Sequence, residues 1–412
     1  MEPCADTKGS FNKLKFIFNN YFKAYALKHP TRVIGHIRDT VNKISFCRTE
    51  IRGGKLFACL KHKYGYIVPF SCGNRFCVTC SSSKTGVWIE KAIKTLTSLD
   101  TPYHFITFTV PSALSRIIQL NKGLLLSSFF KASSGCLLYW SKRRGFLPGM
   151  ILIMQTSGDR LNYHVHIHLL ITSGGLSLRG DRWIKCFHYP PKPILRSFKM
   201  LIYRALRRAF DDQSFEMPPE YAAYSSKKSF NRFLDSLWNL SWNLDISESL
   251  KTTKEILEYI ARYLKKPPKS NKRIIDFDDK FIRFRVKDRE KRWRKTPYLM
   301  AMDYFLMCLF EHIPLPSLRM IRWYGLFSNR NKKQYMEVLQ RLIPVMGGES
   351  DNDSIPLWRR RCKDIYGVDP LICPVCKKEM KLVAILNYMT MSESGLYSFE
   401  KVLLHLQLKS VN

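Results

Sequence analysis

The chain has 412 residues, of which 68 are Lys or Arg and 33 are Asp or Glu, so its formal net charge is +35. A cationic excess of this size is typical of proteins that bind a polyanion such as nucleic acid. Apolar residues make up 45% of the sequence, which excludes disorder as the main state. No uncharged apolar stretch reaches the roughly 18 residues of a membrane helix, and the N-terminus lacks the apolar segment of a secretory signal. We therefore expect a cytoplasmic protein that does not enter a membrane.

The N-terminal region combines a helical pattern with a cysteine cluster. Residues 11–44 alternate apolar and basic positions at roughly helical spacing, and a stretch rich in Cys, Gly and Lys follows up to about residue 85. Five of the twelve cysteines lie between Cys47 and Cys80. Reducing compartments discourage disulfides, so clustered cysteines there favour a metal. We expect residues 1–95 to form a helical arm and a zinc module that contacts DNA.

Two ligand pairs in this module have the spacing of zinc knuckles: Cys59 with His62, and Cys77 with Cys80. Two such pairs supply the four ligands of a tetrahedral Zn²⁺ site, and so short a module needs the metal to fold. The spacing therefore predicts one structural zinc bound by both pairs.

Other cysteines leave alternatives open. Cys47 and Cys72 could form a second site with His36 or could simply pack, and packing is the preferred interpretation. Near the C-terminus, the CPVC sequence has no obvious partner pair, although Cys362 and His405 are present. A zinc site is therefore not favoured there.

The middle of the chain alternates strand and helix patterns. Strands are predicted at residues 103–110, 150–156 and 164–172, helices at 112–142, 193–210, 228–240 and 253–265, and a hairpin at 273–286. The Ser-Gly-Asp of residues 157–159 supplies a turn between the second and third strands, and Thr252 or Thr253 could cap the helix at 253–265. The tail from about residue 296 has a helical pattern. We expect an α+β protein with a catalytic domain at 96–295, built on an antiparallel sheet flanked by helices, and a helical C-terminal region at 296–412.

The strand at 164–172 carries three histidines at alternate positions, His164, His166 and His168. Alternate strand residues point to one face, so the imidazoles form a column, while the opposite face is apolar. A solvated face that happens to use histidine is the alternative. Neutral imidazoles are good metal ligands, and Gln155 on the preceding strand could lie alongside. This mixed set with open positions suits Mg²⁺ or Mn²⁺ acting on a phosphate.

The predicted helix at 253–265 carries Tyr259 and Tyr263, one turn apart on one face. Aromatic pairs at this spacing usually belong to a core. Here the nearby aliphatic residues can cover the core face, and Arg262, Lys265 and Lys266 crowd around the tyrosines. A tyrosine that attacks a metal-polarised phosphate would form a covalent phosphotyrosine, and two tyrosines would permit two successive attacks.

Two further segments interleave basic and aromatic residues, which suits contact with phosphates and exposed bases. Residues 287–298 include Arg292 and Arg294, and residues 321–333 include Arg322. We expect these arginines to contribute to DNA binding.

A His-hydrophobic-His strand followed by a Tyr-x-x-x-Tyr helix resembles the HUH endonuclease superfamily, specifically its two-tyrosine rolling-circle insertion-sequence transposases. LNYHVHIHLLITSGGL resembles the metal strand of that family, and EYIARYLKKPPKSNKRI its nucleophile helix. CRTEIRGGK and SCGNRFCVTC resemble its N-terminal zinc-binding domain, and the likeness extends over roughly residues 30–385. The resemblance implies an HUH-type fold, His166 and His168 as the metal pair, Gln155 as a third ligand, and Tyr259 and Tyr263 as nucleophiles.

The resemblance also implies a function. The chain would be the transposase of a mobile element that nicks single-stranded DNA at the element ends, holds the 5′ end on a tyrosine and transfers it to a target strand. A plasmid or phage replication initiator would use the same chemistry. A zinc-dependent DNA-binding regulator without catalysis, and a metallohydrolase that forms no covalent adduct, remain as alternatives from other classes.

Overall fold

The computed structural model describes residues 5–6, 10–97, 99, 101–247, 252, 255–256, 268–288, 294–330, 332–342, 359, 369, 371–387 and 402–403. The chain divides into two compact units, each built from separate segments. The first unit contains Met1–Trp88, Lys265–Met307 and Ser350–Asn412, and the second contains Ile89–Leu264 and Cys308–Glu349. This division differs from the three consecutive domains expected from sequence, because the C-terminal segment belongs with the N-terminal one.

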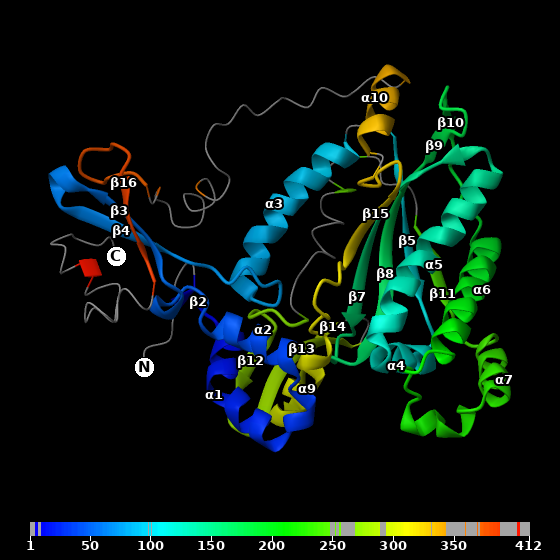
Figure 1. The fold of residues 1–412 in the computed structure, drawn as a ribbon, viewed down its shortest axis with the longest axis horizontal. Helices are drawn as coiled ribbons and strands as arrows, with labels where there is room; N and C mark the ends of the chain where they lie inside the picture. Colours follow the sequence, from blue (N-terminus) through cyan, green and yellow to red (C-terminus); the bar gives the residue numbers. More distant parts are fainter. Residues whose placement is uncertain are drawn as a thin grey trace. The chain divides into compact units, whose positions relative to one another are not determined.

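A five-stranded antiparallel sheet forms the centre of the second unit (Figure 1). Its strands, in spatial order, are β11 (Asn243–Ile246), β5 (Tyr103–Thr109), β8 (Tyr163–Thr172), β7 (Gly149–Ser157) and β15 (Ile321–Gly325). The strands predicted at 103–110, 150–156 and 164–172 are thus confirmed as β5, β7 and β8. Strand β8 lies in the middle of the sheet, where its residues are fixed from both sides.

One face of this sheet is covered by helices, among which α5 and α6 lie along it (Figure 1). The helices of this unit are α4 (Ser112–Leu120), α5 (Lys122–Arg143), α6 (Pro191–Phe210) and α7 (Lys227–Leu237), followed by α10 (Lys332–Leu342). Val165 and Ile167 of β8 pack with Phe129 of α5 and Phe198 of α6 in one apolar core. The alternation seen in the sequence therefore buries one face of β8 and leaves the histidines on the other.

Shorter elements complete the second unit. They are β6 (Phe146–Leu147), β9 (Gly174–Ser177) and β10 (Trp183–Lys185), which form a small antiparallel sheet, and the 3₁₀ helix η4 (Pro219–Tyr224). The single helix expected at 112–142 is interrupted at Asn121, whose backbone is not helical and whose side chain donates to the carbonyls of Ile117 and Glu216.

The first unit contains two three-stranded antiparallel sheets. One consists of β12 (Ile274–Phe277), β13 (Phe281–Asp288) and β14 (Arg294–Ala301), and the other of β16 (Lys381–Leu386), β3 (Gly54–Cys59) and β4 (Tyr64–Pro69). The described helices are α1 (Lys13–Lys28), η1 (Pro30–Arg32), α2 (Gly35–Ser45), η2 (Glu50–Arg52), η3 (Leu60–His62) and α9 (Met302–Glu311). The last four residues of α9 belong to the second unit. Two short strands, β1 (Ala5–Asp6) and β2 (Ser10–Phe11), pair with each other. Helix α3 (Val78–Leu96) continues from this unit into the other.

The structure confirms an α+β fold with antiparallel sheets, and it confirms the hairpin expected at 273–286 as β12 and β13. The C-terminal region is less helical than expected, since β14, β15 and β16 lie in it. Among the helices that the structure describes, none combines the length and the apolar content of a membrane span.

Candidate active site and metal clusters

The three histidines of β8 lie on one face of the central sheet, as the alternation predicts. His168 is buried, while His164 and His166 are half-buried, so the column opens toward solvent at the His164 end. The ring centroids of His164 and His166 are 5.2 Å apart, and those of His166 and His168 are 4.8 Å apart. On the neighbouring strands, Gln155 is paired with His166 and Thr107 with His168.

His166 is oriented by its own strand. Its Nδ1 lies 2.9 Å from the His164 carbonyl oxygen, which can only accept, so Nδ1 carries a proton and donates it. In a neutral ring Nε2 then presents a lone pair, and this atom lies 3.1 Å from Oε1 of Gln155. A neutral imidazole nitrogen and an amide oxygen are both acceptors. Two neighbouring ligands of an octahedral Mg²⁺, each at ~2.1 Å from the ion, would lie ~3 Å apart.

His168 is held by the adjacent strand. Its Nδ1 lies 3.3 Å from the hydroxyl oxygen of Thr107, and its ring stacks on Phe105 with centroids 5.8 Å apart. A polar partner on one imidazole nitrogen fixes the ring and leaves the other nitrogen for a ligand.

Burial keeps these imidazoles neutral. Desolvation lowers the pKa of His166 to about 4, and desolvation together with the nearby His166 lowers the pKa of His168 well below its usual value. Only a neutral imidazole has a lone pair for a metal. His166, His168 and Gln155 therefore suit a divalent cation that acts on phosphate, and such a cation would polarise the phosphorus toward attack.

The turn that joins β7 to β8 is anchored by His312. Its Nε2 donates to the Leu161 carbonyl at 3.0 Å, so its Nδ1 accepts from the Thr156 hydroxyl at 3.1 Å. The His312 ring also stacks on Tyr163, with centroids 5.7 Å apart. These contacts fix the β7–β8 register next to Gln155. The sequence gives no signal for this role, because His312 lies far along the chain.

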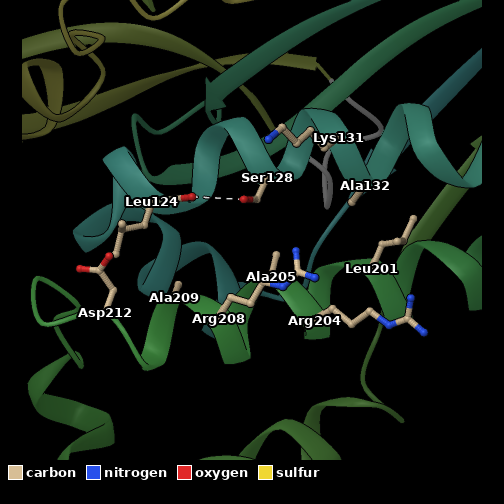
Figure 2. Close-up of a pocket in the computed structure, with 10 residues that line it drawn as sticks. All are labelled: Leu124, Ser128, Lys131, Ala132, Leu201, Arg204, Ala205, Arg208, Ala209 and Asp212. Carbon is tan, nitrogen blue, oxygen red and sulfur yellow. Dashed lines mark hydrogen bonds between the residues drawn. The ribbon is translucent and has the colours of Figure 1, made fainter.

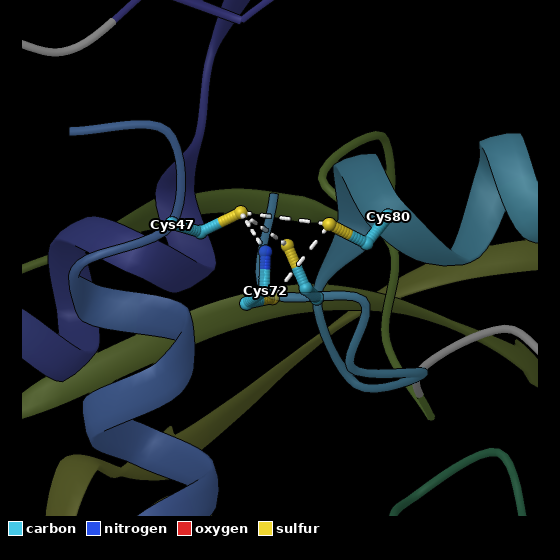
Figure 3. Close-up of side chains that lie close together, drawn as sticks. Cys47, Cys72 and Cys80 are labelled. Carbon is cyan, nitrogen blue, oxygen red and sulfur yellow. Dashed lines mark hydrogen bonds between the residues drawn. The ribbon is translucent and has the colours of Figure 1, made fainter. Parts of the chain in front are cut away.

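Cys47, Cys72, Cys77 and Cys80 converge in the first unit, and we call them the first cysteine cluster (Figure 3). The sulfur of Cys47 lies 3.5 Å from that of Cys80 and 3.8 Å from that of Cys77, and Cys72 lies 3.6 Å from Cys80. Sulfurs around a tetrahedral zinc at ~2.3 Å are ~3.8 Å apart, so the four side chains fit the ion.

Local structure brings these four cysteines together. Cys47 follows α2, Cys72 follows β4, Cys77 directly precedes α3, and Cys80 lies in the first turn of α3. The hydrogen bond with Cys72 lowers the pKa of Cys47 to about 7, while the bond with Cys47 raises that of Cys77. Zinc binds thiolates, so the ion would displace the protons of these thiols.

The single zinc site predicted from the two knuckles is wrong in its grouping. Cys77 and Cys80 join Cys47 and Cys72, not Cys59 and His62, and the cluster does not include His36. The preferred interpretation of Cys47 and Cys72 as packing residues is therefore also wrong. The β3–β4 hairpin keeps the two predicted pairs apart. Cys59 and His62 lie at its turn, and the six residues of β4 then span roughly 20 Å before the chain reaches the first cysteine cluster.

Cys59 and His62 instead meet Cys373 and Cys376 of the CPVC sequence. Within the described residues, these four and the first cysteine cluster are the groups that bring at least three His, Cys or carboxylate ligand atoms within 4.8 Å of one another. Both pairs are recognisable in the sequence, but their spacing does not indicate that they meet.

Several predicted site residues lie outside the described residues: Tyr259, Tyr263, Arg262, Lys265, Lys266 and Arg292. The described residues just before Tyr259 include Thr252, Glu255 and Ile256, of which Glu255 and Ile256 are helical. Thr252 and Glu255 form a capping box, in which the Glu255 amide donates to the Thr252 hydroxyl at 3.2 Å and the Thr252 amide donates to Oε2 of Glu255 at 3.0 Å. Of the two caps expected from the sequence, Thr252 and Thr253, the structure shows Thr252 in the capping role.

The two described arginines of the predicted DNA surface differ in their surroundings. Arg294 is exposed on β14. Arg322 of β15 donates to the Ser127 hydroxyl at 2.8 Å and lies over the Phe130 ring, 4.3 Å from its centroid. Arg322 therefore attaches β15 to α5.

A pocket of about 360 Å³ lies between α5 and α6, and Figure 2 shows its lining. Lys131, Arg204 and Arg208 make it basic. These helices cover the sheet face opposite the histidines, so this pocket is separate from the histidine column.

Comparisons with known proteins agree on one family. Residues 17–110 match the family model described as "Transposase zinc-binding domain", and residues 149–334 match that described as "Putative transposase". The chain is 28% identical over 367 residues to "Putative transposase y4qJ" of Sinorhizobium fredii, covering 87% of this chain and 92% of that protein. It is 29% identical over 364 residues to "Transposase for insertion sequence element IS801" of Pseudomonas savastanoi pv. phaseolicola, covering 86% of each.

No solved structure matches the chain significantly. The second family model includes the histidine strand, and the first includes the first cysteine cluster together with Cys59 and His62. Three findings agree that the chain is similar to transposases. They are the match to a zinc-binding domain, the family match that spans β7, β8 and β15, and the two relatives that are similar along most of the chain. The chain is therefore similar to insertion-sequence transposases along most of its length, and it matches their zinc-binding domain near the N-terminus.

Proposed function

We propose that the protein nicks single-stranded DNA at the ends of its element and transfers the 5′ end to a target strand by rolling-circle transposition, with Tyr259 and Tyr263 as nucleophiles. His166, His168 and Gln155 would hold a catalytic Mg²⁺ or Mn²⁺, which polarises the scissile phosphate when bound. His164 would orient His166 through its carbonyl.

One observation carries this proposal, the approach of Nε2 of His166 to Oε1 of Gln155 at 3.1 Å. Because Nδ1 of His166 donates to the His164 carbonyl, the two facing atoms are both acceptors in the neutral ring. A shared cation would accept a lone pair from each of the two atoms. The spacing also fits two adjacent ligands of a hexacoordinate metal, which leaves open positions for phosphate oxygens.

The tyrosine step then follows from ordinary phosphoryl chemistry. The hydroxyl oxygen of one tyrosine attacks the phosphorus, a bond forms between that oxygen and the 5′ phosphate, and the bond to the 3′ oxygen breaks. The released 3′ oxygen takes up the proton that the tyrosine loses and becomes a 3′ hydroxyl. The phosphotyrosine preserves the phosphodiester energy, and attack by a 3′ hydroxyl on it reverses the bond exchange to join strands.

Two other tyrosines of this unit, Tyr163 and Tyr203, are poor nucleophiles. Desolvation raises the pKa of Tyr163 well above its usual value and that of Tyr203 to about 12. The Tyr203 hydroxyl is also engaged, since it donates to the Leu234 carbonyl at 2.6 Å. These facts favour Tyr259 and Tyr263, for which the capped helix start at Thr252 supports the predicted helix.

The described part of the first unit offers a basic surface for DNA. On β13, Arg283, Arg285 and Lys287 alternate with the buried Ile282 and Phe284, and Arg283 also forms an ion pair with Asp276. Lys287 pairs with Lys295 of β14, so cations gather on one face of this sheet. A row of cations on a sheet suits the phosphates of a strand.

The test is an adduct assay with the full-length protein and labelled single-stranded DNA that carries an element end. We expect a covalent protein–DNA species that requires Mg²⁺ or Mn²⁺ and is absent from Tyr259→Phe/Tyr263→Phe, which loses only the two hydroxyls. DNA cleavage without an adduct would indicate a metallohydrolase, and binding without cleavage would indicate a regulator. Either result would contradict the proposal.

A further inference from the structure

We propose that Cys59, His62, Cys373 and Cys376 form a second zinc site, which fastens the C-terminal segment to the N-terminal hairpin. The four ligand atoms lie within 4.8 Å of one another. The Cys59 sulfur is 3.4 Å from Nδ1 of His62 and 3.8 Å from the Cys376 sulfur, and the Cys373 sulfur is 3.8 Å from Nδ1 of His62. Ligands of a tetrahedral zinc with three thiolates and one imidazole would be ~3.5–3.8 Å apart.

Both halves of this site end in the same backbone conformation, although different hydrogen bonds close their turns. In each, two residues separate the ligands, and a lysine in the left-handed region follows at once: Lys63 has φ 47° and Lys377 has φ 58°. The Lys63 amide donates to the Leu60 carbonyl at 3.4 Å, and the Lys377 amide donates to the Cys373 carbonyl at 2.9 Å. Left-handed backbone costs energy for a residue with a side chain. Its use twice, at equivalent places, points to a shared ligand that both turns must face.

The ligand chemistry selects zinc. Three thiols with one imidazole form a soft donor set, unlike the oxygen-rich sets that bind magnesium or calcium. A disulfide is not the explanation, because Cys59, Cys373 and Cys376 are free and the 3.8 Å between the sulfurs of Cys59 and Cys376 is far beyond a bond. The Cys373 side chain has no exposed surface, so its sulfur points into the cluster and not into solvent.

The surrounding structure explains what the metal would accomplish. Strand β16 pairs with β3 from Lys381 opposite Ala58 to Leu386 opposite Gly54, so C-terminal residues complete an N-terminal sheet. The apolar core beside the site is small, with Tyr64, Cys373 and Met380 as its buried members. A core of this size stabilises little by itself, and a metal that joins the two chain segments supplies the missing free energy.

This site shares no ligand with the first cysteine cluster. The match to the zinc-binding domain ends at residue 110, so it includes Cys59 and His62 but not Cys373 or Cys376. The zinc module would therefore include residues from the C-terminal segment as well as the N-terminal one. It does not depend on the proposed nicking reaction, because zinc content is measured without DNA.

The primary test is the zinc content of the purified full-length protein by elemental analysis. We expect about two zinc ions per chain, and about one in Cys373→Ser/Cys376→Ser. Cys186→Ser is the matched control, since Cys186 is half-buried and lies outside both clusters, and it should retain both ions. One zinc in the unaltered protein, or two in the double variant, would overturn the proposal.

Substitution of His62 tests the same site if the double variant fails to fold. His62→Cys keeps a ligand and should retain two zinc ions, whereas His62→Ala should lower the content to about one. Limited proteolysis gives the structural readout, because residues 371–387 should be cleaved faster in His62→Ala than in His62→Cys. Equal zinc content and equal cleavage in the two variants would contradict the site.

Discussion

Replacement of Thr107 by Val probes the histidine column without altering a metal ligand. Thr107 and Val have nearly the same shape, so the substitution removes only the hydroxyl that lies 3.3 Å from Nδ1 of His168. Once that partner is lost, the His168 ring is no longer oriented for a ligand through its other nitrogen. Loss of such outer partners typically weakens metal affinity about 10–100-fold. Because the contact is long, we expect about 10-fold, or about 1.4 kcal/mol.

The assay is nicking of labelled single-stranded DNA as a function of Mg²⁺ or Mn²⁺ concentration. Thr107→Val should need about 10-fold more metal for half-maximal rate, and saturating metal should restore most of the activity. Thr109→Val is the matched control, since Thr109 is paired with His166, whose Nδ1 is already bonded to the His164 carbonyl. An unchanged metal requirement in Thr107→Val, or an equal increase in Thr109→Val, would refute this reasoning.

The remaining predictions concern stability and metal. Arg322→Ala should lower the melting temperature by about 5 °C in a thermal scan, because it removes the bond to Ser127 and the cation–π contact with Phe130; weaker DNA binding at unchanged stability would instead identify Arg322 as a DNA contact. His312→Ala should destabilise the fold by about 1–3 kcal/mol in denaturant unfolding, since the Leu161 carbonyl loses its donor in a buried site, and an unchanged midpoint would contradict that role. Chelation should abolish nicking, and added Mg²⁺ or Mn²⁺ should restore it; full nicking in excess chelator would exclude the metal site.

Local pattern was sufficient to predict the β7–β8 hairpin. Alternation fixes which face of a strand is buried, so Val165 and Ile167 could be assigned to the core and His166 to the other face from sequence alone. The short turn keeps the two strands adjacent, which also placed Gln155 beside His166. Two supporting residues were not predictable: Thr107, which contacts His168, and His312, which anchors the β7–β8 turn, because both lie far from β8 in the sequence.

The zinc ligands show the limit of spacing arguments. Spacing identifies a pair that can share one metal, but it does not say which pairs meet. His62 and Cys373 are 311 residues apart, and only the pairing of β16 with β3 brings them together.

Proline concealed one strand in the C-terminal region. Pro297 lies in β14, which is an edge strand of its sheet, where a missing amide hydrogen is tolerated. The helical expectation for the tail failed at this strand because sequence does not reveal that it lies at an edge.

The most direct measurement of the proposed mechanism is the position of the DNA on the protein. Single-stranded DNA that carries an element end should be incubated with the protein and Mg²⁺, and the digested adduct should be mapped by mass spectrometry. We expect a 5′-phosphotyrosine at Tyr259 or Tyr263, and no adduct from a Tyr259→Phe/Tyr263→Phe variant that still binds DNA. DNA attached to another residue, such as Tyr163 or Tyr203, or an adduct that persists in the double variant, would contradict it.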